Sequence, residues 1–296
     1  MTYQVDILKV TALLKIIIQV RVNHKELNWI NQQEKKLQNH FQLRSLYLAF
    51  SSAPRFISKN TLFLTEEELS KADLLRKGFQ PERWNLLQCV RTYLLPVEDT
   101  ESFGATLTKL FETADMEEQV TLYAALPLLP CPDILAKRAA EGIRTNITDV
   151  FDSIALHNPF PFDYLNEDAW NQMILKAVFM KRPLYRIYGS DKRVNAELAR
   201  MLVDFAHERW AAKRPVSPEL WRFVGPFLNE EYIADIKKVI DGEPLEMEAG
   251  LLACASGKQP EAKQLLDKYP EVKKEIKSGR LNWTIIGKKI EDMVGA

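Results

Sequence analysis

The chain has 296 residues, 46% of them hydrophobic and 27% charged, and 40 basic and 40 acidic side chains give it a formal net charge of zero. This composition is typical of a globular protein and excludes a largely disordered one. The chain lacks the overall positive charge of non-specific nucleic-acid binders, so we expect no nucleic-acid partner. Three widely spaced cysteines, Cys89, Cys131 and Cys254, favour free thiols in a reducing compartment, and we expect a cytoplasmic protein.

The first apolar run, residues 10–22, is predicted to be a core helix. Lys15, Gln19 and Arg21 interrupt it, and it is too short and too charged to span a bilayer. We therefore expect neither a transmembrane segment nor a signal peptide. A helix that lies on a membrane surface is the alternative reading of this run.

Between residues 100 and 156 the pattern indicates short helices. Four apolar residues share one helical face, namely Phe103, Leu107, Leu110 and Phe111. Asp115 and Glu118 have the spacing of a capping box, in which each residue satisfies a backbone N–H of the other. Asp133 is predicted to cap the next helix, and residues 148–156 are predicted to form another.

The second half of the chain carries clearer helix boundaries. Asn195 is predicted to cap a long amphipathic helix. Asn229 is predicted to cap a helix that ends at Asp241-Gly242, where glycine suits a left-handed exit. Pro244 and Pro260 are predicted to start the helices that follow, because proline fits the first turn of a helix.

Short helices joined by short turns predict an all-α fold of irregular, stacked antiparallel helix pairs. Such an array is a HEAT-like α-solenoid, which leaves one concave face open for binding. We expect a single all-helical domain, residues 1–296, within which residues 1–100 are a candidate N-terminal helical subdomain. No common repeat motif links the helix pairs.

Signatures of common catalytic sites are missing from the sequence. It contains no glycine-rich phosphate loop, no Gly-x-Ser-x-Gly elbow and no His-x-x-x-His pair. We therefore predict no cofactor and no metal, although spacing alone does not exclude a site assembled from distant helices. An enzyme is less favoured than a non-catalytic protein.

Polar and aromatic residues are concentrated between residues 157 and 222, which hold two of the four histidines and three of the six tryptophans. Prolines keep the segment around residue 158 extended, which suits ligand contact, and a simple connection between helices is the alternative. We assign as candidate ligand-binding residues His157, Asn158, Trp170, Asn171, Asp191, Arg193, Asn195, His207, Arg209, Trp210, Trp221 and Arg222.

Two of these assignments have explicit alternatives. Asp204 lies three residues before His207, so a helix places both on one face, where they are candidates for a catalytic acid–base pair. The alternative is a structural polar contact between helices. Trp170 lies on an apolar helical stripe and is read as a core residue more readily than as a site residue, whereas Asn171 is expected to reach solvent or a cleft.

The same stretch resembles the EboA family. The resemblance rests on the sequences His157-Asn158-Pro159-Phe160-Pro161, Ala169-Trp170-Asn171-Gln172-Met173, His207-Glu208-Arg209-Trp210-Ala211-Ala212 and Pro218-Glu219-Leu220-Trp221-Arg222, with Asp191, Arg193 and Asn195 between them. It covers about residues 80–255, and the first eighty residues carry no matching motif. It implies a bacterial protein of a gene cluster for making or trafficking a small metabolite, including export of an aromatic pigment precursor. It assigns no catalytic residue.

Three functions follow from these observations. The favoured one is a non-catalytic helical adaptor or metabolite carrier, whose partners are a small metabolite or proteins of the same gene cluster, with peripheral contact to a membrane partner as a further expectation. The second is an enzyme of the same pathway that uses Asp204 and His207 on an anionic or aromatic metabolite. The third, a nucleic-acid-binding helical repeat, is disfavoured by the net charge.

Overall fold

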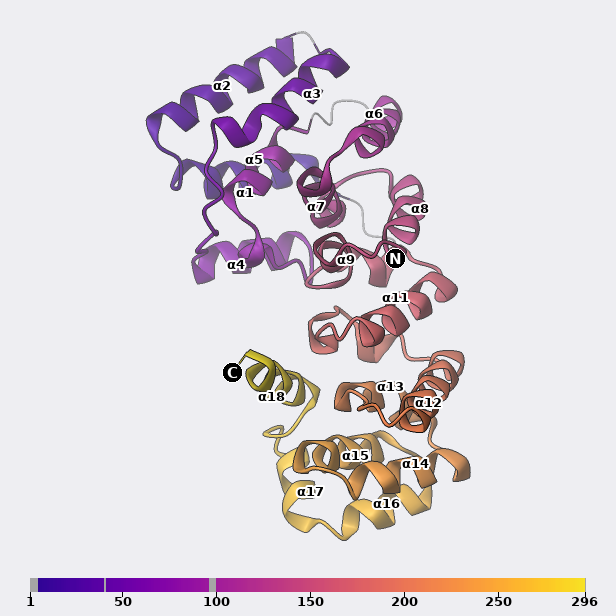
Figure 1. Cartoon of the computed structure of the whole chain (residues 1–296). Helices are drawn as coiled ribbons and strands as arrows, with labels where there is room; N and C mark the ends of the chain where they lie inside the picture. The colour runs from indigo at the N-terminus through magenta and orange to yellow at the C-terminus, as the bar shows by residue number, and fades with distance from the viewer. Residues whose placement is uncertain (1–4, 40, 96–99, 296) are drawn as a thin grey trace. The chain divides into compact units, whose positions relative to one another are not determined.

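The computed structural model describes residues 5–39, 41–95 and 100–295, and these residues fold into eighteen α-helices joined by short turns and 3₁₀ segments (Figure 1). The one β feature among them is an isolated antiparallel bridge between Thr61 and Asn85. The all-α prediction is confirmed. The HEAT-like arrangement of helix pairs stays a prediction.

The chain divides into two compact units, Met1–Leu165 and Asn166–Ala296. The predicted single domain and the predicted subdomain 1–100 stay predictions. Unit 1 contains α1 Ile7–Gln19, α2 His24–Asn39, α3 Leu43–Ser52, α4 Glu66–Leu75, α5 Leu86–Tyr93, α6 Thr100–Thr113, α7 Met116–Ala124, α8 Pro132–Gly142, α9 Thr148–Ala155 and α10 Phe160–Tyr164. Unit 2 contains α11 Glu167–Phe179, α12 Ala196–Ala211, α13 Trp221–Val224, α14 Glu230–Ile240, α15 Pro244–Ser256, α16 Pro260–Asp267, α17 Pro270–Lys277 and α18 Trp283–Gly295.

Helix α1 is the core helix that the first apolar run predicts. Its buried side chains recur every three or four residues and pack against α4 and α5; they are Val10, Leu13, Leu14, Ile17 and Ile18. Within the described ranges, no helix is both long and apolar enough to cross a bilayer.

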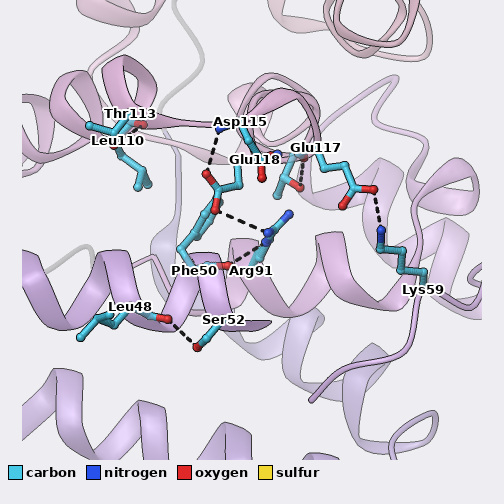
Figure 2. A network of polar contacts seen from close by, with 11 residues as sticks. Leu48, Phe50, Ser52, Lys59, Arg91, Leu110, Thr113, Asp115, Glu117 and Glu118 are labelled. Atoms are coloured by element: carbon cyan, nitrogen blue, oxygen red, sulfur yellow. Dashed lines mark hydrogen bonds and ion pairs between the residues drawn. The ribbon is translucent and has the colours of Figure 1, made fainter. Parts of the chain in front are cut away.

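A buried ion pair ties three helices of unit 1 together (Figure 2). The Arg91 guanidinium on α5 donates from Nε to the Phe50 carbonyl of α3 at 3.0 Å and lies 3.6 Å from the Glu118 carboxylate of α7. The two charged side chains are only 1% and 6% exposed. Burial lowers the pKa of Arg91, the expected direction for a cation removed from water.

Glu118 belongs to the predicted capping box. Its carboxylate accepts the Asp115 N–H at 3.0 Å, and the Asp115 carboxylate accepts the Glu118 N–H at 2.8 Å. The Glu118 side chain thus both caps the start of α7 and pairs with the charge of Arg91. The pair therefore links a local helix signal to the tertiary packing of unit 1.

Other helix boundaries test the sequence reading further. Asn195 and Asn229 cap α12 and α14 through their side chains, as predicted. The prediction for Asp133 is wrong, because α8 begins at Pro132 and Asp133 lies in its first turn. The left-handed exit at Gly242 is also wrong: α14 ends in the right-handed residue Asp241, and the glycine is not among the described residues with positive φ.

Left-handed residues follow three helices of unit 2: Gly279 follows α17 with φ 75°, and two lysines follow α11 and α12. Lys181 follows α11 with φ 55°, and Lys213 follows α12 with φ 54°. Beyond them, the Arg182 N–H donates to the Ala177 carbonyl and the Arg214 N–H to the Arg209 carbonyl, each at 2.8 Å. This is the Schellman arrangement, in which glycine normally takes the left-handed position.

We predict that Lys213→Gly raises the free energy of unfolding by about 0.5–1 kcal/mol, because glycine removes the cost of a Cβ atom in the left-handed region. Lys268 ends α16 at φ −72° and is also exposed, so Lys268→Gly is the matched control and should lower stability. Urea unfolding of both variants measures the effect. Equal loss of stability in the two would contradict the prediction.

Candidate functional site

Unit 2 contains a hollow of about 640 Å³, which we call the α11–α18 hollow. The end of α11, the second half of α12, the segment 215–219 and one face of α18 form its wall. Most of the wall is apolar, from Val178, Phe179, Pro183, Phe205, Pro215, Val216, Pro218 and Ile290. Its charged side chains are few, and they are Lys181, Arg182, Arg209, Glu219 and Glu291.

Glu219 is a buried carboxylate in the wall of this hollow, with 2% of its surface exposed. It accepts the backbone N–H of Leu184 at 3.0 Å and that of Tyr185 at 2.6 Å, and Arg222 lies 4.0 Å away. Burial raises the pKa of Glu219 to about 7, outweighing the backbone hydrogen bonds and Arg222, which favour the charged form. Glu219 thereby fastens the 3₁₀ segment Leu184–Arg186 to the segment Pro218–Leu220.

Helix α18 packs closely against the Glu219 carboxylate because residue 287 is a glycine. A Cβ atom on Gly287 would collide with the Tyr185 ring and lie 2.8 Å from Glu219 Oε1. Further along α18, Glu291 accepts hydrogen bonds from the Tyr185 hydroxyl and from Arg186, both at 2.5 Å. Close backbone approach and this ion pair together hold α18 as one wall of the hollow.

Among the candidate residues from the sequence, Arg209 lines the α11–α18 hollow. It lies in the last turn of α12, half-buried. Its Nε and Nη2 atoms both donate to the Pro215 carbonyl, at 3.2 and 3.1 Å. This contact holds the guanidinium against the loop that follows the helix.

Several other candidates are brought together, but as supports of unit 2. Asn171 is buried, contrary to the expectation that it reaches solvent, and its side chain exchanges hydrogen bonds with Asn195 at 3.2 and 2.8 Å. Trp170 is fully buried, and Arg193 lies over its ring at 4.7 Å.

A second supporting contact joins the candidates Asp191 and Arg222. The guanidinium of Arg222 donates from Nε and Nη2 to both carboxylate oxygens of Asp191, each at 2.7 Å. The Arg222 side chain is 6% exposed and that of Asp191 58% exposed. A fork-to-fork pair of this kind fixes the orientation of both groups.

Asp204 and His207 each have another partner in the structure, and their role as an acid–base pair stays a prediction. The carboxylate of Asp204 accepts from Arg200, one turn earlier on α12, at 2.8 Å. Nε2 of His207 instead contacts both oxygens of Asp235 on α14, at 2.9 and 2.8 Å. The contact partner of His207 thus comes from α14 rather than from its own helix, and neither His207 nor Asp235 lines the α11–α18 hollow.

Trp210 lies beside this histidine, and Trp221 lies beside Trp210. The Trp210 ring is 5.9 Å from the His207 ring and is stacked on Trp221 at 5.7 Å. The ammonium of Lys238 lies 3.8 Å from the centre of the Trp210 ring, a close cation–π contact. These rings extend the packing between α12, α13 and α14.

The remaining candidates, His157 and Asn158, lie in unit 1 and line a different hollow, of about 340 Å³. The Asn158 amide donates to the carbonyls of Tyr123 and Ser153 at 3.0 and 2.9 Å and accepts the Phe160 N–H at 3.0 Å. These hydrogen bonds fix the conformation of the loop that contains Asn158. His157 has a left-handed backbone with φ 55°, and its Nδ1 atom contacts the Gln80 side-chain oxygen.

Sequence reasoning did not select the two residues that most shape the α11–α18 hollow. Glu219 stood inside a motif used for the family resemblance but was not selected as a site residue; a glutamate near a helix start is usually solvated. Gly287 lies far along the chain from the polar-aromatic stretch, and nothing in its neighbourhood points to the hollow.

We predict that the contribution of Glu219 to stability falls as the pH rises from 4.5 towards 7. Its pKa is raised on folding, so over this range the unfolded chain releases the proton first and is favoured. The free energy of unfolding of the native chain should fall relative to Glu219→Gln by about 2–3 kcal/mol across the range. Glu208→Gln, an exposed position on α12, is the control.

Urea unfolding at several pH values makes this comparison. Parallel stability curves for the native chain and Glu219→Gln would show that the carboxyl titrates alike in both states. That result would contradict the proposed cost of burying its charge.

The chain matches the model of a known protein family. The family model described as "Metabolite traffic protein EboA" matches residues 10–225, more than half of the chain. The match includes most of the first eighty residues, which the sequence motifs left without an assignment. No match to the chain was found among curated proteins or among solved structures. The chain belongs to the EboA family of metabolite traffic proteins.

Proposed function

We propose that this protein is a non-catalytic carrier or adaptor that binds a small metabolite in the α11–α18 hollow. The observation that carries the proposal is the hollow itself. Its volume of about 640 Å³ is that of a small-molecule site, and its wall is mainly apolar with a few charged groups.

The walls of the hollow are held in place by contacts already present in the chain. Glu219 fastens the segment 184–185, and Glu291 joins α18 to Tyr185 and Arg186. A site whose walls are fixed in advance loses little conformational entropy when a ligand enters. This supports binding to a preformed site.

The proposed setting follows the resemblance and the family description. We infer a bacterial, cytoplasmic protein that takes part in the traffic of an aromatic pigment precursor and passes it to proteins of the same gene cluster. The apolar wall, with Phe179 and Phe205 in it, supports an aromatic ligand. The family description supports a role in metabolite traffic.

An enzyme of the same pathway is less well supported. Its acid–base pair was to be Asp204 and His207, and Asp204 is paired with Arg200 instead. The contact of His207 with Asp235 would orient an imidazole, but it lies outside the wall of the hollow. The binding role therefore remains the proposal.

Calorimetric titration of the full chain with the uncharged probe N-phenyl-1-naphthylamine tests the proposal. We expect saturable binding that Ile290→Trp weakens by about tenfold or more, because the larger side chain fills part of the hollow. Met293→Trp is the matched control, since Met293 lies on the same helix, is 68% exposed and does not line the hollow.

Thermal unfolding of each variant shows whether it is folded. No binding by the native chain, or equal binding by the Ile290→Trp and Met293→Trp variants, would refute the proposed site.

A further inference from the structure

We propose that the α11–α18 hollow selects an amphipathic acid, a ligand with an apolar body and one anionic group, and that Arg209 recognises the anionic group. This inference rests on the proposed function, because it specifies the ligand of the same hollow. It depends on which charges in the wall are already neutralised and which are not.

The two carboxylates of the wall already have partners. Glu291 accepts hydrogen bonds from Tyr185 and from the guanidinium of Arg186. Glu219 accepts two backbone N–H groups, and Arg222 lies 4.0 Å away. A cationic ligand would therefore have to compete with groups that are held by the fold.

Two cationic side chains of the wall, in contrast to these carboxylates, have no partner of opposite charge within the described residues. Lys181 and Arg209 line the hollow, and neither forms an ion pair with any described residue. At the ends of α11 and α12, the carbonyls of Ala177 and Arg209 already accept hydrogen bonds from backbone N–H groups. The side chains of Lys181 and Arg209 therefore do not have to cap these helix ends. The hollow thus offers positive charge without a matching carboxylate.

Arg209 is the better placed of the two for recognition. Its Nε and Nη2 atoms are fixed on the Pro215 carbonyl, which orients the guanidinium plane, and Nη1 makes no hydrogen bond within the described residues. A planar guanidinium matches the geometry of a carboxylate and is half-buried here, where water screens the interaction less.

The apolar side chains of the wall determine what the non-acidic part of the ligand can be. Phe205 lies four residues before Arg209, one helical turn away on the same helix, and Val216 follows the loop that Arg209 contacts. A ligand whose acidic group meets Arg209 can therefore place an apolar body against Phe205 and Val216. A fully polar anion would leave these side chains without contact.

Displacement of N-phenyl-1-naphthylamine from the full chain tests this inference. The competitors are 2-naphthoate and 2-naphthamide, which have nearly the same shape and differ in charge. We expect 2-naphthoate to displace the probe at a concentration at least about fivefold lower. Arg209→Gln should abolish this preference, and Arg209→Lys should keep part of it.

Arg200→Gln is the matched control, because Arg200 lies on the same helix but pairs with Glu197 and Asp204 away from the hollow. It should keep the full preference for 2-naphthoate. Equal displacement by the two competitors, or a preference that survives Arg209→Gln, would overturn the inference and leave the proposed function standing. Failure of the uncharged probe to bind the native chain would refute the proposed function itself, and the inference with it.

Discussion

The α11–α18 hollow depends on the burial of one carboxylate, that of Glu219. It joins two segments that are distant in sequence, 184–185 and 218–220, through backbone N–H groups, and α18 passes close beside it at Gly287. Burying this group is costly, as its raised pKa shows. The cost is offset because one side chain satisfies two backbone donors that a short 3₁₀ segment cannot satisfy by itself.

In unit 1 a different buried side chain, that of Arg91, joins segments that are distant in sequence. Its helices are short, and helices of this length are marginal in isolation, so tertiary contacts must hold them. The buried Arg91 connects the carbonyl end of α3 to the carboxylate that starts α7. In both units a buried ionisable side chain with backbone partners joins segments that are distant in sequence.

The sequence predicted local features well and long-range partners poorly. The capping box of Asp115 and Glu118 and the cap at Asn195 were predictable because both are made within four residues. The partner of His207 was not, because Asp235 reaches it from another helix, while the nearer Asp204 prefers Arg200. Spacing along one helix indicates which nearby residues are candidate partners. It carries no information about residues that the tertiary fold brings close.

The candidate site shows the same limit. Polar residues at Asn158, Asn171 and Asn195 marked an unusual stretch of sequence, but their side chains satisfy the backbone or each other. Within the hollow of unit 2 only Arg209 had been selected. The other contributors, Lys181 and the wall from α18, have ordinary local sequences and gain their role from position alone.

Intermolecular NOEs between N-phenyl-1-naphthylamine and the methyl groups of the full chain test the central claim most directly, because they locate the bound ligand. The account predicts NOEs to the methyls of Val178, Val216 and Ile290, all of which line the α11–α18 hollow. NOEs confined to Leu87, Val120 and Leu156, which line the hollow of about 340 Å³ in unit 1, would contradict it.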